Sequence, residues 1–305
     1  MQINKFRGLI AAPFTPMKED GSVNTDVITS YAEKLQNNGV KGVFICGTTG
    51  EGMLMTTDER KTVAEAWIKE QGIDFKVIVH VGTTSSQQSN ELAQHAQKAC
   101  AYAVGCMGPV FLKPTRVEQL VDFCTEVAAG SPELPFYYYH IPTVSGINLS
   151  MSEFIGKAAP RIPNFTGIKF TDNNFMEMQQ CLDIDNGKYD ILHGYDELLL
   201  AGLVFGAKAA IGSTYNFMAP FYNEIINDFK NGDIKEARKK QLTSVKIIAI
   251  LNSYGGAIVS GKRLMKTVGI DCGDFRSPVT KFKENEYENF IDDLKNAGFF
   301  EIIKS

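Results

Sequence analysis

The sequence has no continuous apolar run long enough to cross a bilayer, and its first residues, MQINKFRGLIAAPFTP, contain no apolar core typical of signal peptides. A formal charge of −4 leaves no basic face that would attract nucleic acid. These absences favour a cytoplasmic protein with neither a membrane nor a nucleic-acid partner. The chain has 305 residues, 44% of them hydrophobic, so it can bury one large core or two medium ones.

The sequence also lacks the cysteine and histidine motifs that are typical of metal sites. The six cysteines form no CxxC pair, and the four histidines show neither an HExxH motif nor the i, i+4 spacing of helical metal ligands. We therefore expect reduced thiols and no bound metal.

Short apolar runs alternate with longer helical patterns along most of the chain. No GxGxxG fingerprint follows the first strand, which disfavours a dinucleotide-binding fold. The pattern predicts an α/β fold, a (β/α)8 TIM barrel over residues 1–222, with a C-terminal helical extension over residues 223–305 packed on it as part of a single structural unit. The strands are expected at residues 7–14, 42–46, 76–81, 104–111, 136–140, 165–171, 190–195 and 207–215.

One lysine lies near the carboxyl end of the sixth expected strand, in the stretch FTGIKFTDNN. Lys169 is surrounded there by β-forming apolar residues, and a buried amine in a cleft is what a carbonyl substrate needs to form a Schiff base. The alternative is a strand-end lysine whose side chain extends to solvent. The stretch alone leaves both interpretations open.

Other polar residues follow neighbouring strands, and in a barrel the carboxyl ends of the strands meet at one rim. Residues 47–51, GTTGE, form a turn whose hydroxyls and amides suit a carboxylate or phosphate. Tyr139 ends the fifth strand, and residues 194–197, GYDE, and Ser213 follow the seventh and eighth. A lysine, a tyrosine, an anion-binding turn and a carboxylate pair are thus expected on one rim.

These motifs carry a family resemblance over essentially the whole chain. The sequence resembles the N-acetylneuraminate lyase and dihydrodipicolinate synthase superfamily of pyruvate-dependent class I aldolases. The resemblance implies a (β/α)8 barrel, a homotetramer, and a lysine that forms an imine with pyruvate. The matching segments are GTTGE at 47–51, YYYHIP at 137–142, GIKFT at 167–171, GYDE at 194–197 and IGSTYN at 211–216.

Within this superfamily the lyase branch is the closer resemblance. The synthase branch has an arginine for the second substrate's carboxylate two residues after the YxxP proline, where this sequence has Val144. The synthase branch also uses a tyrosine from a neighbouring subunit, and residues 108–113 contain none. Asp196 and Glu197 match the lyase motif that holds a polyhydroxylated tail, for which carboxylates are good acceptors.

The resemblance implies cleavage of N-acetylneuraminate, a sialic acid, to pyruvate and N-acetylmannosamine, without a metal or a dissociable cofactor. Lys169 would form the imine, Tyr139 would transfer the proton with help from Thr48, and the turn around Thr48 and Thr49 would bind the carboxylate. The sugar tail would be held by Thr171, Gly194, Asp196, Glu197 and Ser213.

Simpler roles compete for several of these residues. Tyr139 is also the third tyrosine of an aromatic strand, Asp196 is also placed to cap the following helix, and Ser213 is a small residue of a kind common at barrel rims. At the level of function, the alternatives are another pyruvate-dependent aldolase of the same superfamily, such as the synthase or a sugar-acid aldolase, and a non-enzymatic barrel that keeps the pocket.

Overall fold

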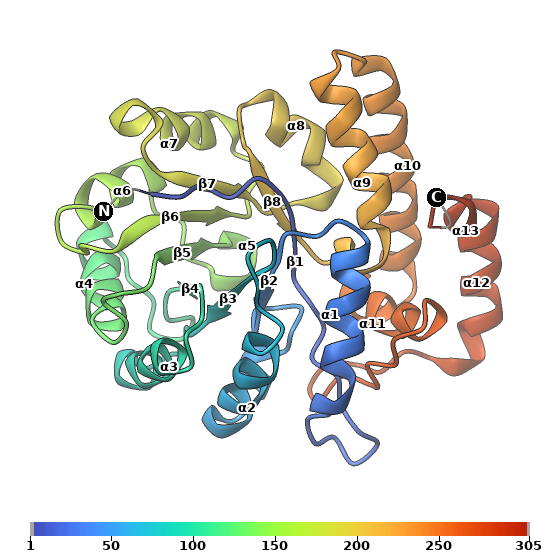
Figure 1. Cartoon of the computed structure of the whole chain (residues 1–305), viewed down its shortest axis with the longest axis horizontal. Helices are drawn as coiled ribbons and strands as arrows, with labels where there is room; N and C mark the ends of the chain where they lie inside the picture. The colour runs from blue at the N-terminus through green and yellow to red at the C-terminus, as the bar shows by residue number, and fades with distance from the viewer. Residues whose placement is uncertain (1–2, 304–305) are drawn as a thin grey trace.

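A computed structural model describes residues 3–303, and its centre is a closed barrel of eight parallel strands (Figure 1). Each strand pairs with the next in the sequence, and β1 pairs with β8. The predicted (β/α)8 barrel is therefore confirmed. The strands are β1 Gly8–Ala11, β2 Gly42–Ile45, β3 Lys76–His80, β4 Ala103–Cys106, β5 Phe136–His140, β6 Phe165–Phe170, β7 Asp190–His193 and β8 Ala209–Gly212.

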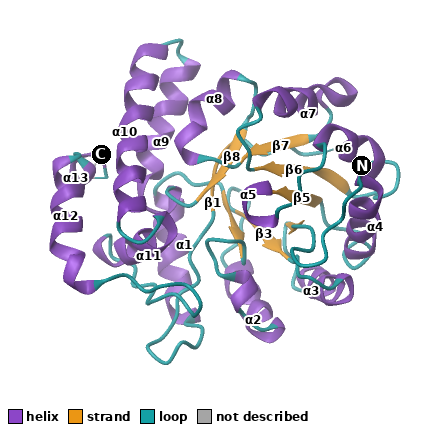
Figure 2. Cartoon of the chain, turned by 180° about the vertical axis from the view of Figure 1, so that it is seen from behind, coloured by secondary structure: helices purple, strands orange, loops and turns teal. Residues whose placement is uncertain are grey.

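Helices surround the barrel, and α10 to α13 extend beyond α9 on one side of the molecule (Figures 1 and 2). Short 3-10 helices η1 to η4 lie at Thr25–Val27, Gly52–Leu54, Asp196–Leu198 and Glu284–Glu286. The α-helices are α1 Ile28–Asn37, α2 Thr57–Ile68, α3 Ser86–Lys98, α4 Val117–Ala128, α5 Pro142–Ser145, α6 Met151–Ala158, α7 Phe175–Gly187, α8 Leu199–Val204, α9 Tyr215–Lys230, α10 Ile234–Ser253, α11 Ala257–Thr267, α12 Tyr287–Asn296 and α13 Phe299–Ile302.

Several expected boundaries were wrong at the carboxyl ends of the strands. The strand expected at 104–111 ends at Cys106, because Gly108 and Pro109 break the ladder and proline has no N–H to donate. The division expected at residue 222 falls inside α9, which continues past Pro220 to Lys230. The barrel and the extension therefore share the part of α9 that follows its kink at Met218.

Alternation along the strands separates two apolar cores. Phe44, Ile78, Tyr139, Leu192 and Ile211 belong to the core inside the barrel, whereas their strand neighbours pack outward in the larger core beneath the helices. The polar residues of the inner face are therefore confined to the carboxyl end of the barrel and a few positions at its amino end.

The C-terminal helices pack against the barrel wall. Helix α10 contacts both α9 and α11, and α11 carries buried residues along its length. No single helix within residues 3–303 is long and apolar enough to span a membrane, although α10 and α11, which are bent by 103° at their junction, meet that length and composition as a pair.

Candidate active site

Lys169 lies on the inner face of β6, directly opposite Tyr139 of β5 in the strand register. Its side chain is buried, and residue Lys169 is only 5% exposed. Nζ lies 4.0 Å from the ring centroid of Tyr139 and 4.5 Å from that of Phe44. Within the described residues Nζ takes part in no ion pair and no hydrogen bond. The amine is therefore held inside the barrel mouth, and the alternative of a lysine extended to solvent is wrong.

Tyr139 is the nearest group with a transferable proton. Its hydroxyl lies 3.4 Å from that of Thr48, which sits on the turn after β2. Its ring is fixed by edge contacts with Phe44 and His80, with centroids 5.4 Å and 5.8 Å away. The ring therefore packs as an inner-core aromatic, while its hydroxyl faces the rim. The two interpretations of Tyr139 are compatible.

The turn after β2 presents unpaired backbone donors. The N–H groups of Thr48, Thr49 and Gly50 donate to no acceptor in the described part of the chain. The turn is closed by bonds from Glu51 N–H to Thr48 O, 3.2 Å, and from Gly52 N–H to Gly47 O, 3.1 Å. Successive free N–H groups in a turn form a concavity that suits an anion. The turn therefore has free donors for a carboxylate, and its binding of one remains a prediction.

The fold of this turn depends on a close backbone approach. A Cβ at Gly52 would lie 1.8 Å from the carbonyl oxygen of Cys46, so a side chain there is incompatible with the turn. The hydroxyl of Thr15, after β1, donates to the carbonyl of Gly50 over 2.6 Å. Contacts from β1 and β2 thus hold the free N–H groups in place.

Thr171 and Gly194 lie together after β6 and β7. Thr171 is 5% exposed, and its hydroxyl has no partner among residues 3–303. A Cβ at Gly194 would lie 2.0 Å from that hydroxyl oxygen, so the two residues are in direct contact. An unsatisfied buried hydroxyl costs free energy, which a hydroxylated ligand would recover by bonding to it.

Asp196 is buried beside β8. Its Oδ2 accepts hydrogen bonds from the N–H and the hydroxyl of Thr214, over 2.7 Å and 2.6 Å. Burial raises the pKa of Asp196 to about 7, and the bonds from Thr214 oppose that rise. The expected helix-capping role is wrong, because Tyr195 is the capping residue of η3 and Asp196 is its first residue. The carboxylate instead joins the loops after β7 and β8.

Glu197 and Ser213 complete the predicted set, and both are half-buried on the same two loops. All residues predicted for the site thus lie within the last residues of β5 and β6 or just after β2, β6, β7 and β8, at the carboxyl end of the barrel. Their substrate contacts remain a prediction.

Phe44 and His80 were missed as parts of this site. His80 is buried, with Nδ1 3.0 Å from Cys46 O and Nε2 3.3 Å from the N–H of Met107. Burial, together with the charge of Arg60, lowers the pKa of His80 well below its usual value. The neutral ring therefore donates from Nδ1 and accepts at Nε2, tying the ends of β2 and β4. Strand alternation could have placed both inside the barrel, since Phe44 lies on the second expected strand and His80 two residues after Ile78 on the third, but no sequence signal showed what His80 binds.

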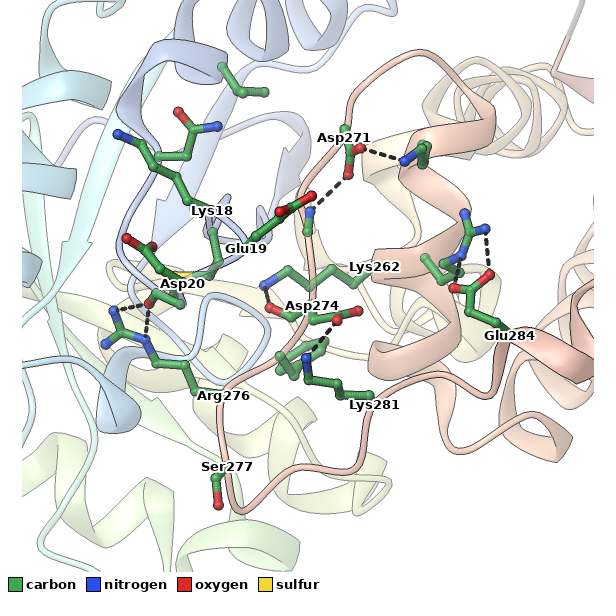
Figure 3. Close-up of a pocket in the computed structure, with 18 residues that line it drawn as sticks. Lys18, Glu19, Asp20, Lys262, Asp271, Asp274, Arg276, Ser277, Lys281 and Glu284 are labelled. Atoms are coloured by element: carbon green, nitrogen blue, oxygen red, sulfur yellow. Dashed lines mark hydrogen bonds and ion pairs between the residues drawn. The ribbon is translucent and has the colours of Figure 1, made fainter.

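A separate pocket of about 880 Å³ lies beyond this turn, between residues 17–24 and the C-terminal extension (Figure 3). None of the predicted site residues lines it. Several of its basic side chains are already paired with acidic ones. These pairs are Arg263 with Glu284, Lys266 with Asp271 and Lys281 with Asp274.

Known proteins resemble the chain over nearly its full length. Residues 5–297 match the dihydrodipicolinate synthetase family. N-acetylneuraminate lyase A of Xenopus laevis is 39% identical over 93% of this chain and 94% of its own. The structure of Proteus mirabilis N-acetylneuraminate lyase is 41% identical, with a TM-score of 0.94, covering 97% of this chain and all of that one.

A more distant solved structure is that of a catalytic lysine mutant of Ruminococcus gnavus sialic acid aldolase. It is 25% identical, with a TM-score of 0.90, and the match covers 96% of this chain and 95% of that one. A family match over most of the chain, together with relatives near 40% identity, agrees with the barrel fold. The chain therefore belongs to the dihydrodipicolinate synthetase family.

Proposed function

We propose that this protein is a Schiff-base-forming aldolase that reversibly cleaves N-acetylneuraminate to pyruvate and N-acetylmannosamine. The observation that carries the proposal is the buried amine of Lys169, which forms no ion pair or hydrogen bond within residues 3–303 and lies opposite Tyr139. The names of the relatives, sialic acid lyases and aldolases, support this substrate over others.

Imine formation begins the reaction. The lone pair of Nζ attacks the C2 ketone of the open-chain sugar acid, and loss of water leaves an iminium. The substrate carboxylate next to C2 is held by the free N–H groups of Thr48, Thr49 and Gly50. The amine of Lys169 and the turn thus act on adjacent carbon atoms.

Bond cleavage follows from the iminium. Tyr139 gives its proton to the C2 oxygen that leaves as water, and the phenolate that results takes the proton of the C4 hydroxyl. The C3–C4 bond then breaks, and its electron pair moves into the iminium to give an enamine and the aldehyde of N-acetylmannosamine. Tyr139 then returns a proton to C3, and water hydrolyses the imine to release pyruvate. The hydroxyl of Thr48, 3.4 Å from that of Tyr139, assists these proton transfers.

The hydroxylated tail lies along the opposite part of the rim. The free hydroxyl of Thr171 and the carboxylates of Asp196 and Glu197 accept hydrogen bonds from the sugar, with Gly194 and Ser213 lining the same path. Val144, on α5, supplies no cation for a second carboxylate, which favours a neutral sugar tail over an acidic aldehyde substrate.

We infer that the enzyme works as a homotetramer in the cytoplasm. Phe111 and Leu112 are 82% and 83% exposed, and exposed apolar side chains of this size are typical of subunit contacts. Sedimentation of the purified protein at several concentrations tests the assembly, and a monomer at all of them would contradict it.

Coupled detection of pyruvate released from N-acetylneuraminate tests the activity. The same assay with related sugar acids, and a condensation assay of pyruvate with aspartate semialdehyde, distinguish the sister aldolases. Release of pyruvate from N-acetylneuraminate at the highest kcat/KM is the expected result. Efficient condensation with aspartate semialdehyde and no cleavage of the sialic acid would overturn the proposal.

A further inference from the structure

A buried ion pair joins the carboxylate-binding turn to the C-terminal extension. Glu51 ends the turn, Lys262 lies on α11, and both side chains are 1% exposed. The Lys262 ammonium donates to Glu51 Oε1 over 2.5 Å and to the carbonyl of Asp274 over 2.9 Å. Figure 3 shows Lys262 reaching toward Asp274 within the pocket between the two segments.

The second carboxylate oxygen of Glu51 is also bound by the extension. The backbone N–H of Arg276 donates to Oε2 over 2.9 Å. The guanidinium of Arg276 bonds to both oxygens of Glu59 and to the carbonyls of Gly21 and Leu54. Arg276, which follows α11, therefore binds the turn, the start of α2 and the loop after β1.

The backbone of Glu51 is in a conformation that a residue with a side chain rarely adopts. Its φ is +57°, in the left-handed region, where Cβ crowds the backbone. Such a conformation persists only where the surrounding contacts hold it. The bonds to Lys262 and Arg276 supply those contacts, because they fix both oxygens of the side chain.

The conformation of Glu51 decides where the free donors of the turn point. The N–H of Glu51 closes the turn on the carbonyl of Thr48, so a change in its φ would rotate the peptide units just before it. The nearest of these units carries the paired N–H of Glu51, and the two before it, which move with it, carry the unpaired N–H groups of Gly50 and Thr49. Through its bonds to Glu51, the extension therefore influences the orientation of the free N–H groups in the anion site.

We propose that Glu51 and Lys262 are positioning residues, through which the C-terminal extension holds the turn in the conformation that binds the substrate carboxylate. This inference rests on the proposed aldolase function. The competing interpretation is a buried ion pair that affects stability alone, since removing one partner of such a pair leaves an uncompensated charge.

Pyruvate affinity separates the two interpretations. Trapping the imine with borohydride over a range of pyruvate concentrations gives the half-saturating concentration, and thermal unfolding gives the stability. For Lys262→Met and Glu51→Gln we expect the half-saturating concentration to rise roughly 10- to 100-fold, the usual effect of misplacing a binding group. Lys266→Met, on the same helix but in an exposed pair with Asp271, is the matched control and should bind pyruvate as the wild type does.

The double variant Glu51→Gln/Lys262→Met decides the outcome, because it leaves no unpaired charge. It should regain thermal stability relative to the single variants and still require more pyruvate. Wild-type half-saturation in the double variant would overturn the positioning role while leaving the aldolase intact. A wild type that forms no imine would instead refute the proposed function, and the inference with it.

Discussion

The side chain of Lys169 combines burial with the lack of a counter-ion. A lysine ammonium is strongly hydrated, and its transfer into a protein interior costs free energy unless a partner replaces the water. At Lys169 the neighbours are the rings of Phe44 and Tyr139, which attract a cation only weakly compared with a carboxylate. Burial of Lys169 therefore lowers the stability of the folded protein, and it leaves the amine without a hydrogen bond or ion pair that a substrate would have to displace.

The first prediction concerns that amine. Borohydride added with pyruvate should give a covalent adduct on Lys169 and abolish activity, and peptide mapping by mass spectrometry locates it. Lys169→Met should remain folded, because methionine has a similar length and suits the apolar surroundings. An adduct on Lys113, Lys208 or another lysine would contradict the assignment.

Tyr139 provides the second prediction. Tyr139→Phe keeps the ring contacts with Phe44 and His80 but removes the hydroxyl that faces Thr48. We expect kcat to fall by about 10²-fold or more, the usual size of a general acid-base contribution, while the imine still forms. Steady-state kinetics beside Tyr189→Phe, a control outside the barrel core, measures this. A Phe variant with near wild-type kcat would leave Tyr139 a packing residue only.

Asp196 gives a pH-dependent prediction. Its pKa of about 7 means that its carboxylate, the better acceptor for sugar hydroxyls, forms only as the pH rises through about 7. The KM for N-acetylneuraminate should therefore fall over that range. Asp196→Asn should remove this inflection and lower kcat/KM by roughly 10- to 100-fold, the equivalent of one charged hydrogen bond.

Pyruvate serves as the control ligand for Asp196, because it has no tail. Imine trapping should show nearly the same half-saturating pyruvate concentration for the wild type and Asp196→Asn. An equal loss for both ligands would mean that the bonds to Thr214 make Asp196 a structural residue.

Helix α2 begins with a capping box that the sequence predicts and the structure contains. The hydroxyl of Thr56 accepts from the N–H of Glu59, and the Glu59 carboxylate accepts from the N–H of Thr56. That same carboxylate binds the guanidinium of Arg276, which lowers the pKa of Glu59 to about 2. The start of this helix is therefore also an attachment point for the C-terminal extension.

Removal of the cap tests how much this start contributes. Thr56→Ala should lower the free energy of unfolding by about 1 kcal/mol, because one N-terminal N–H loses its acceptor. Thr62→Ala, on the exposed face of the same helix, should change it by no more than about 0.5 kcal/mol. Urea unfolding measures both, and equal losses would show that the cap is redundant with the contacts of Arg276.

The sequence predicts elements well where local signals are strong and less well where distant contacts decide. The bounds of β5 match the expected 136–140, since an aromatic run is bounded by prolines on both sides. The strand expected to reach residue 111 stops at Cys106, and the apolar residues Val110 and Phe111, which suggested a longer strand, lie on the loop after it. Helix α5 is too short to show a helical period, and it was missed.

The same limit applies to the site. The rule that barrel strands present their carboxyl ends at one rim is enough to bring Lys169, Tyr139 and Thr48 together. No local pattern shows that the buried partner of Glu51 lies 211 residues away, on α11. That partner is fixed by how the extension packs on the barrel, which depends on the whole fold.

At the amino end of the barrel, a second buried carboxylate makes the stability of the whole molecule depend on pH. Asp190 accepts from the N–H of Phe6 and the hydroxyl of Tyr137, both at 3.0 Å. Burial nevertheless raises its pKa to about 6 from an ordinary 3.8. The folded state therefore binds a proton that the unfolded state has already released, and stability falls as the pH rises from about 4 through 6.

This loss gives the last prediction. The part of the loss that is due to Asp190 should be on the order of 3 kcal/mol between pH 4 and pH 8, the equivalent of its raised pKa. Asp190→Asn should remove most of it, because the amide oxygen can accept from both Phe6 and Tyr137. Urea unfolding at several pH values measures the slope, and an unchanged slope in the Asn variant would assign the dependence to another group, such as Asp196.

Closure of the barrel has a consequence for how the chain acquires its activity. The turn after β2 and the amine on β6 are remote in sequence, and they face one another only once all eight strands have formed a ring. Contacts between remote segments form slowly during folding, because the loop between them must be ordered first. Trapping of pyruvate during refolding therefore reports when the ring closes. A chain whose helices have formed while its barrel is still open should give the full helical circular dichroism signal and no adduct.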